Sequence, residues 1–166
     1  MNRRRFNRTL LRALFVSVCL LIAAGPLLGA DKSDKFIGVW KLNKAKSKYI
    51  RDREPKNLKL KWKSYGNGGI RFSSERFAAE GSIQYTAFYD GKDYPVRFAE
   101  GYDTVSLNRI DDNTVECIFK KNGQTVSTSR RVLSPDGASM TVIATGTNNA
   151  EGEAQDTDVY DREASN

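Results

Sequence analysis

The chain has 166 residues, with 27 Lys and Arg, 20 Asp and Glu, two Cys and no His, a length that fits one domain. Without histidine, neither Ser-His-Asp nor Cys-His catalysis nor the usual His-containing zinc sites can be built, and two cysteines are too few for an all-thiolate zinc site. We therefore expect no metal, no cofactor and no enzymatic activity.

Five of the basic residues are arginines within residues 1–30, which contain no acid. From Asp31 onward the chain has 22 basic and 20 acidic residues, so this part of the chain is nearly neutral. The basic excess therefore does not indicate a nucleic-acid partner.

Residues 1–30 have the three parts of an export signal: a positive start, an apolar run over residues 13–24, and small residues ending at Ala30. An uncleaved anchor is the alternative, because residues 13–30 are an uncharged stretch. We expect cleavage after Ala30, which leaves a periplasmic or secreted domain of residues 31–166 with no membrane span. Its single thiol, Cys117, makes no internal disulfide, and we expect it in the core.

The mature chain is predicted to consist of strands separated by turns, with no helical periodicity beyond two turns. Turn signals include Asp90-Gly91 and Asn122-Gly123, which are typical of tight hairpins. The expected strands are residues 36–43, 58–63, 70–77, 82–90, 94–98, 102–110, 114–121, 124–134, 140–144 and 155–162.

Strands joined by short loops are antiparallel neighbours, and a large twisted sheet closes or splits because exposed edges invite aggregation. We expect an all-β, antiparallel up-and-down barrel of 8–10 strands. A two-layer sandwich is the alternative. One connection, residues 44–56, is longer and basic, and is interpreted either as a solvated loop or as a flap near a barrel mouth.

Aromatic side chains on successive strands are expected to point inward, where they either fill the barrel or line a cavity. An inward Arg without a protein carboxylate would indicate an anionic ligand, and Arg71, Arg76, Arg97, Arg109, Arg130 and Arg131 all fall on predicted strands. The predicted ligand-binding residues are Trp62, Phe72, Tyr85, Tyr89, Phe119 and Arg130.

The segment Gly38-Val39-Trp40 resembles the Gly-x-Trp of the lipocalins. In that family the Trp plugs the closed end of the barrel against an Arg from the last strand. The resemblance implies that Gly38 and Trp40 form a barrel floor, covered by Arg162 or by Arg130.

The strand count is similar to that of the calycins, the group that contains lipocalins and fatty-acid-binding proteins. In the latter, an Arg two places before the Tyr of the last strand holds the ligand carboxylate, and this chain has Asp158 there, before Tyr160. Residues 40–48 and 134–137 look most like exported bacterial lipocalin-like proteins with no assigned activity.

These observations predict non-covalent binding of a small apolar or amphipathic ligand inside the barrel. The alternatives are a filled barrel acting as an envelope interaction or inhibitor module, and a carboxylate-dependent enzyme using residues such as Glu75, Glu80, Glu100, Asp103 or Glu116. The ligand itself is not determined by the sequence.

Overall fold

The computed structural model describes residues 33–49, 57–76, 82–146 and 156–164, and in these ranges the chain is all-β with no helix. The ten strands are β1 (Gly38–Leu42), β2 (Asn57–Tyr65), β3 (Gly69–Arg76), β4 (Gln84–Phe88), β5 (Tyr94–Arg97), β6 (Thr104–Asp111), β7 (Thr114–Lys121), β8 (Gln124–Leu133), β9 (Ser139–Gly146) and β10 (Asp156–Arg162). The predicted export signal and its cleavage site lie outside the described residues.

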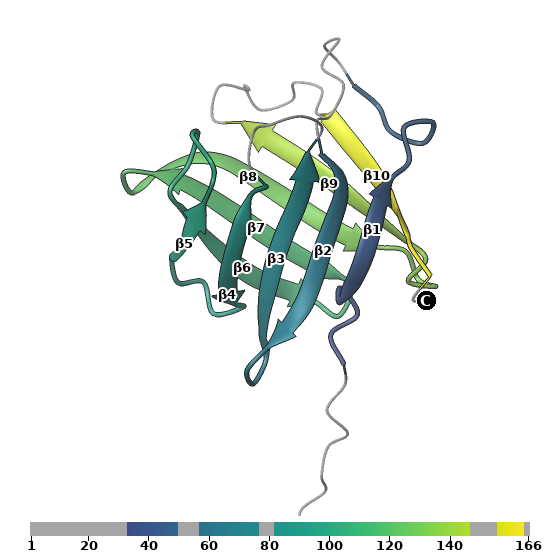
Figure 1. The fold of residues 1–166 in the computed structure, drawn as a ribbon, viewed down its shortest axis with the longest axis horizontal. Coiled ribbons are helices and arrows are strands. Elements are labelled where there is room, and N and C mark those ends of the chain that lie inside the picture. Colours follow the sequence, from purple (N-terminus) through teal and green to yellow (C-terminus); the bar gives the residue numbers. More distant parts are fainter. Residues whose placement is uncertain (1–32, 50–56, 77–81, 147–155, 165–166) are drawn as a thin grey trace, which may run out of the picture. The chain divides into compact units, whose positions relative to one another are not determined.

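Each strand pairs with its sequence neighbours in antiparallel register, and β1 also pairs with β10, which closes the ring (Figure 1). This is the predicted up-and-down barrel, with ten strands, and not a sandwich. The closing seam brings Trp40 opposite Arg162 and Leu42 opposite Tyr160. The described part of the chain offers no helix that is long and apolar enough to cross a membrane.

Up-and-down connectivity divides the strand ends between two rims. We call the rim where β1, β3, β5, β7 and β9 end the upper rim, and the rim where β2, β4, β6, β8 and β10 end the lower rim. Residues 33–37 precede β1 and therefore belong to the lower rim.

Alternation along each strand sets its two faces. In β2, Leu60 and Trp62 are buried, whereas Lys63 is exposed and the side chains of Lys59 and Lys61 remain partly exposed. The same alternation runs through β7, where Val115, Cys117 and Phe119 are buried. The inward residues of all walls therefore form one continuous core.

A β-bulge interrupts the alternation of β8. Lys120 pairs with Thr125 and Phe119 pairs with Ser127, so Val126 is an extra residue on the β8 side. Such a bulge moves every following side chain to the opposite face of the strand. Downstream of Val126 the odd-numbered residues of β8 point inward, and Ser129, Arg131 and Leu133 are buried.

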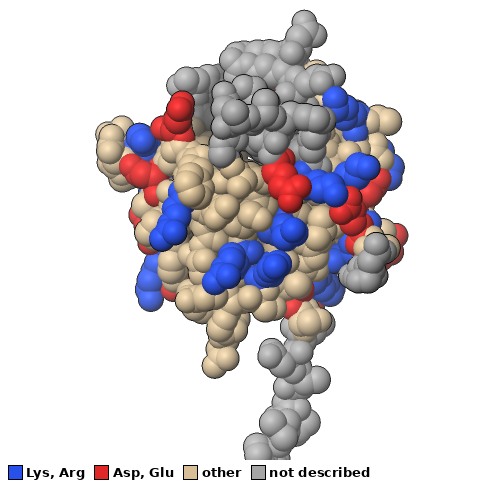
Figure 2. All heavy atoms as spheres, in the orientation of Figure 1, with Lys and Arg blue, Asp and Glu red and all other residues tan. Residues whose placement is uncertain are grey.

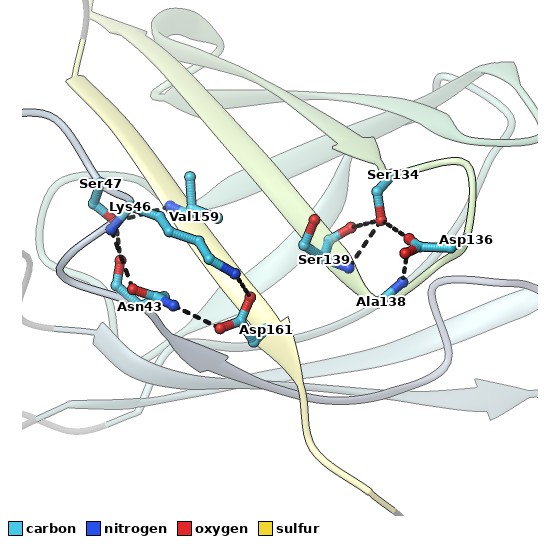
Figure 3. Close-up of polar contacts among 9 residues, drawn as sticks. All are labelled: Asn43, Lys46, Ser47, Ser134, Asp136, Ala138, Ser139, Val159 and Asp161. Atoms are coloured by element: carbon cyan, nitrogen blue, oxygen red, sulfur yellow. Dashed lines mark hydrogen bonds and ion pairs between the residues drawn. The ribbon is translucent and has the colours of Figure 1, made fainter.

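Two hydrogen-bonded corners lie beside β10 (Figure 3). At one of them, the Asp161 carboxylate accepts hydrogen bonds from Asn43 Nδ2 at 2.6 Å and Lys46 Nζ at 2.9 Å, and Val159 N–H donates to Ser47 Oγ at 2.9 Å. The described part of the predicted basic flap, residues 44–49, thus continues along β10, with a bridge between Lys48 and Thr157. Residues 50–56 of that segment lie outside the described ranges.

The second corner is the turn between β8 and β9. The Ser134 hydroxyl donates to Asp136 Oδ1 at 2.5 Å and accepts from Ser139 N–H at 2.9 Å, while Ala138 N–H donates to Asp136 at 3.0 Å. Both corners thus lie beside the last strand, one after β1 and the other between β8 and β9.

Candidate functional site

The lower end of the barrel is closed by Trp40 and Arg162. Trp40 is fully buried, its Nε1 donates to the carbonyl of Phe36 at 3.0 Å, and the Arg162 guanidinium carbon lies 4.0 Å from its ring centroid. Arg162 donates to three backbone carbonyls, of Gly137 at 2.8 Å, Ile37 at 2.8 Å and Lys35 at 2.5 Å. Its donors are thus used to tie residues 35–37 and the 134–138 turn across the floor.

Gly38 leaves space for this arrangement. Its φ of +147° belongs to the region that favours glycine, and a Cβ built on it would lie 2.6 Å from Arg162 Nη1. The structure therefore brings Gly38, Trp40 and Arg162 together, whereas Arg130 is not part of the floor.

A second cluster at this end holds the segment before β1. Arg109 Nη2 lies 2.8 Å from Asp34 Oδ2, and the Tyr89 hydroxyl donates to the same carboxylate at 2.5 Å. Arg109 also stacks over the Tyr89 ring at 4.0 Å. Burial and the neighbouring Asp34 carboxylate both raise the pKa of Tyr89.

Tyr89, one of the predicted ligand-binding residues, is not among the residues that line the interior cavity. The physical reason is its position beyond the end of β4, where the strand has already reached the lower rim. Its polar atom is engaged by Asp34.

A cavity of about 190 Å³ lies inside the barrel. It adjoins the beginnings of β2 and β10 and the ends of β3 and β9, so it is on the upper side of the core, away from Trp40. The lining residues are Leu60, Phe72, Ser74, Ile83, Tyr102, Phe119, Ser127, Ser129, Arg131, Val142, Ala144, Asp158 and Tyr160.

Arg131 is the cation of this cavity. It is 5% exposed, its Nη1 donates to the Tyr85 hydroxyl at 2.9 Å, and its guanidinium carbon lies 4.9 Å from the Trp62 ring and 4.8 Å from the Phe72 ring. Its buried Nε has no hydrogen-bond partner among the described residues. No described carboxylate lies within ion-pairing distance of it, so the guanidinium retains donors for a further acceptor.

Further polar groups surround this cation. Within the described ranges, the buried hydroxyls of Ser74 and Ser129 also have no hydrogen-bond partner. A buried polar group left unpaired is unfavourable unless a bound molecule or water satisfies it. The cavity is thus apolar on several sides and polar around Arg131.

The strand register places Asp158 in the same cross-strand row as Arg131, with Val142 between them. Burial raises the pKa of Asp158, which favours its protonated form. Burial also raises the pKa of Tyr160, with a further contribution from Asp158. Asp158 is thus an inward acid, and the cation in its row comes from β8.

Arg130 was expected inside the barrel and is exposed on its outer face. Counted without a bulge from the Asn122–Gly123 hairpin, Val126 would oppose Phe119 and Arg130 would point inward. The bulge at Val126 reverses the faces, so Arg131 takes the interior position instead.

The other predicted residues surround Arg131 on two sides. Phe72 and Phe119 line the cavity, while Trp62 and Tyr85 contact the guanidinium. The Phe72 ring meets Trp62 edge to face and stacks on Tyr85. The prediction missed Ser74, Ser129, Asp158 and Tyr160, and inward alternation was the one signal that could have found them.

Cys117 is buried, and burial raises the pKa of its thiol.

Comparison of the chain with protein-family models and with curated protein sequences gives no match.

Proposed function

We propose that this barrel binds a small anionic amphipathic molecule non-covalently, with the anionic group against Arg131 and the apolar part among Phe72, Phe119 and Ile83. The observation that carries the proposal is a buried guanidinium, facing a cavity, without a described carboxylate partner. A buried charge is strongly unfavourable unless it is paired, and an anionic ligand would supply the missing partner.

The cavity volume supports a particular size of ligand. A cavity of about 150 Å³ holds one benzene molecule. At about 190 Å³, this cavity suits a single-ring or short-chain carboxylate better than a long-chain fatty acid. Most of the remaining interior is occupied by packed aromatic side chains.

We further propose that the chain is a calycin-type barrel that works outside the cytoplasm. Support comes from the closed antiparallel barrel, from the Trp40 and Arg162 floor, and from the export signal predicted over residues 1–30. No catalytic step is part of the proposal.

Arg130 and Arg131 are adjacent on β8 and point to opposite faces of the barrel, so replacing each in turn gives a variant and its matched control. Isothermal titration of the full chain with octanoate, 1-octanol and palmitate should show saturable binding of octanoate and weaker binding of the other two. Arg131→Met should weaken octanoate binding by about 10- to 100-fold, since a buried hydrogen bond to a charged group contributes about 1.5–3 kcal/mol.

Arg130→Met removes the same charge from the outer surface and should leave octanoate affinity unchanged. Equal losses in both variants, or equal binding of octanoate and 1-octanol, would contradict an anion site at Arg131. Native mass spectrometry of the purified protein, followed by identification of any released molecule, then names the natural ligand.

A barrel that acts through its outer surface remains the second candidate, and the filled lower half of the interior favours it. If no carboxylate probe binds, and native mass spectrometry finds the protein without a bound molecule, we would propose instead that the barrel acts through its outer surface.

A further inference from the structure

A groove of about 450 Å³ lies on the outer face of the barrel, across β3, β4 and β5. It forms where strand pairing is short, because β4 and β5 share two register pairs, Gln84 with Arg97 and Tyr85 with Val96, and β5 and β6 also share two. Pro95 has no N–H for a ladder, which suits it to such a gap. The groove is lined by Arg71, Gln84, Tyr85, Thr86, Pro95 and Arg97.

The groove carries an excess of positive charge. Arg71 and Arg97 are exposed, and neither lies within ion-pairing distance of a carboxylate in the described ranges. Lys63 stands directly opposite Arg71 on β2 and faces the same side. Like charges directly opposite each other on neighbouring strands are destabilising, and an anion would relieve the repulsion.

Figure 2 looks onto this face, where Lys and Arg side chains gather over β2 and β3. The two lysines of β2 nearest the upper rim are compensated, because Lys59 pairs with Glu163 at 2.9 Å and Lys61 lies 3.9 Å from Glu75. Within the described ranges, Lys63, Arg71 and Arg97 by contrast have no carboxylate within ion-pairing distance, and the Arg71 guanidinium carbon lies 5.5 Å from the Tyr65 ring.

We infer that this outer groove binds a phosphoryl group of a soluble compound or of a lipid headgroup. Two guanidinium groups match the charge of a phosphomonoester, which is about −1.5 to −2 at pH 7. Their planar forks suit its terminal oxygens, and Gln84 and Thr86 add an amide and a hydroxyl between them. The groove opens outward, and it shares Tyr85 with the surroundings of Arg131.

Phe98 bears on the source of the phosphoryl group. It directly follows Arg97, is 64% exposed and has a φ of 61°, an uncommon backbone conformation for a residue with a side chain. An exposed ring next to an anion-binding Arg can contact the acyl chain of a lipid.

The test is a titration of the ¹⁵N-labelled full chain with glycerol 3-phosphate, followed by NMR, with acetate at equal ionic strength as the control anion. Saturable shifts should appear at the amides of Arg71, Thr86 and Arg97. In the double variant Arg71→Gln/Arg97→Gln the affinity should fall by at least about tenfold, because two charge-assisted contacts are lost. Both side chains are exposed, so thermal unfolding should stay as in the wild type.

The double variant Lys121→Gln/Arg130→Gln is the matched control, since it removes the same charge from β7 and β8 on the opposite wall of the ring. It should retain the wild-type affinity within about twofold. Absence of saturable shifts, equal shifts with acetate, or equal losses in the two double variants would overturn the inference.

A second titration shows whether the phosphoryl group belongs to a soluble compound or to a lipid. Monomeric dihexanoyl phosphatidic acid should bind more tightly than glycerol 3-phosphate if the ligand is a lipid, and Phe98→Ala should abolish that difference. Equal affinities of the two compounds would assign the groove to a soluble phosphoryl compound.

Discussion

Two arginines of this barrel lie over tryptophan rings, yet their surroundings give them different roles. Arg162 lies over Trp40 and donates to three backbone carbonyls. Arg131 lies near Trp62 and donates to one tyrosine hydroxyl, with its Nε unpartnered among the described residues. A group whose donors are used stabilises the fold, whereas a buried group with unused donors is available to a ligand.

This difference predicts the effect of replacing Arg131 on stability. The double variant Arg131→Met/Tyr85→Phe removes both partners of a buried hydrogen bond and an unpaired buried charge. Such replacements are nearly neutral or stabilising, so urea denaturation should give an unfolding free energy at least equal to that of the wild type within about 1 kcal/mol. A loss of several kcal/mol would instead assign Arg131 a structural role.

Replacing Trp40 should have the opposite effect on stability. Its full burial predicts that Trp40→Ala lowers the unfolding free energy by about 3 to 5 kcal/mol in the same assay. Lys41→Ala changes the exposed neighbouring residue and should alter stability by no more than about 0.5 kcal/mol. Wild-type stability of the Trp40 variant would show that Trp40 does not stabilise the floor of the barrel.

At the scale of elements, alternation and turn residues predict the strands closely. The predicted range 114–121 coincides with β7, and the predicted range 124–134 ends one residue beyond β8. Local chemistry is sufficient here because Asn122-Gly123 sets the hairpin and β-branched residues fill the strands. Closure of the ring was also predictable, since ten strands with short loops have few other ways to cover their edges.

The cavity was less predictable because it depends on which face each residue presents. The bulge at Val126 has no distinctive sequence signal, and it determined that Arg131, not Arg130, faces the interior. Tyr89 follows the inward alternation of β4 and packs against the core, but it lies past the end of that strand, where its hydroxyl donates to Asp34. Pairing register therefore limits what a single sequence reveals about a barrel interior.

The bulge itself gives a prediction. Deleting Val126 leaves Ser127 opposite Phe119 and Arg131 inward, so the variant should keep its register and its octanoate binding. It should lose about 1 to 3 kcal/mol from the half-buried valine, measured by urea denaturation. Loss of folding, or an exposed Arg131 by NMR, would show that the bulge is needed to bend β8.

At the scale of the whole molecule, the barrel depends on the seam between its first and last strands. Asp161 of β10 accepts hydrogen bonds from Asn43 and Lys46, which follow β1, and these contacts lower the pKa of Asp161. A carboxylate with a lowered pKa stabilises the folded state above its unfolded pKa of about 4, and this contribution is lost as the pH falls through the folded pKa.

Asp161→Asn should therefore lower the unfolding free energy by at most about 1 kcal/mol at pH 7, because the carboxylate is partly exposed. The difference between wild type and variant should shrink toward zero as the pH falls well below 4. Chemical denaturation at pH 7 and at successively lower pH measures this, and a difference independent of pH would show that the charge of Asp161 is irrelevant to the seam.

The position of Trp62 beside Arg131 also gives the protein an internal optical reporter. The charge of the guanidinium, 4.9 Å from the indole ring, contributes to the electric field that sets the emission wavelength of Trp62. An anion bound at Arg131 would change that field, whereas Trp40 under Arg162 lies at the far end of the core and would not respond. With Trp40 replaced by Phe, the emission wavelength of Trp62 would report the occupancy of the cavity without any added dye.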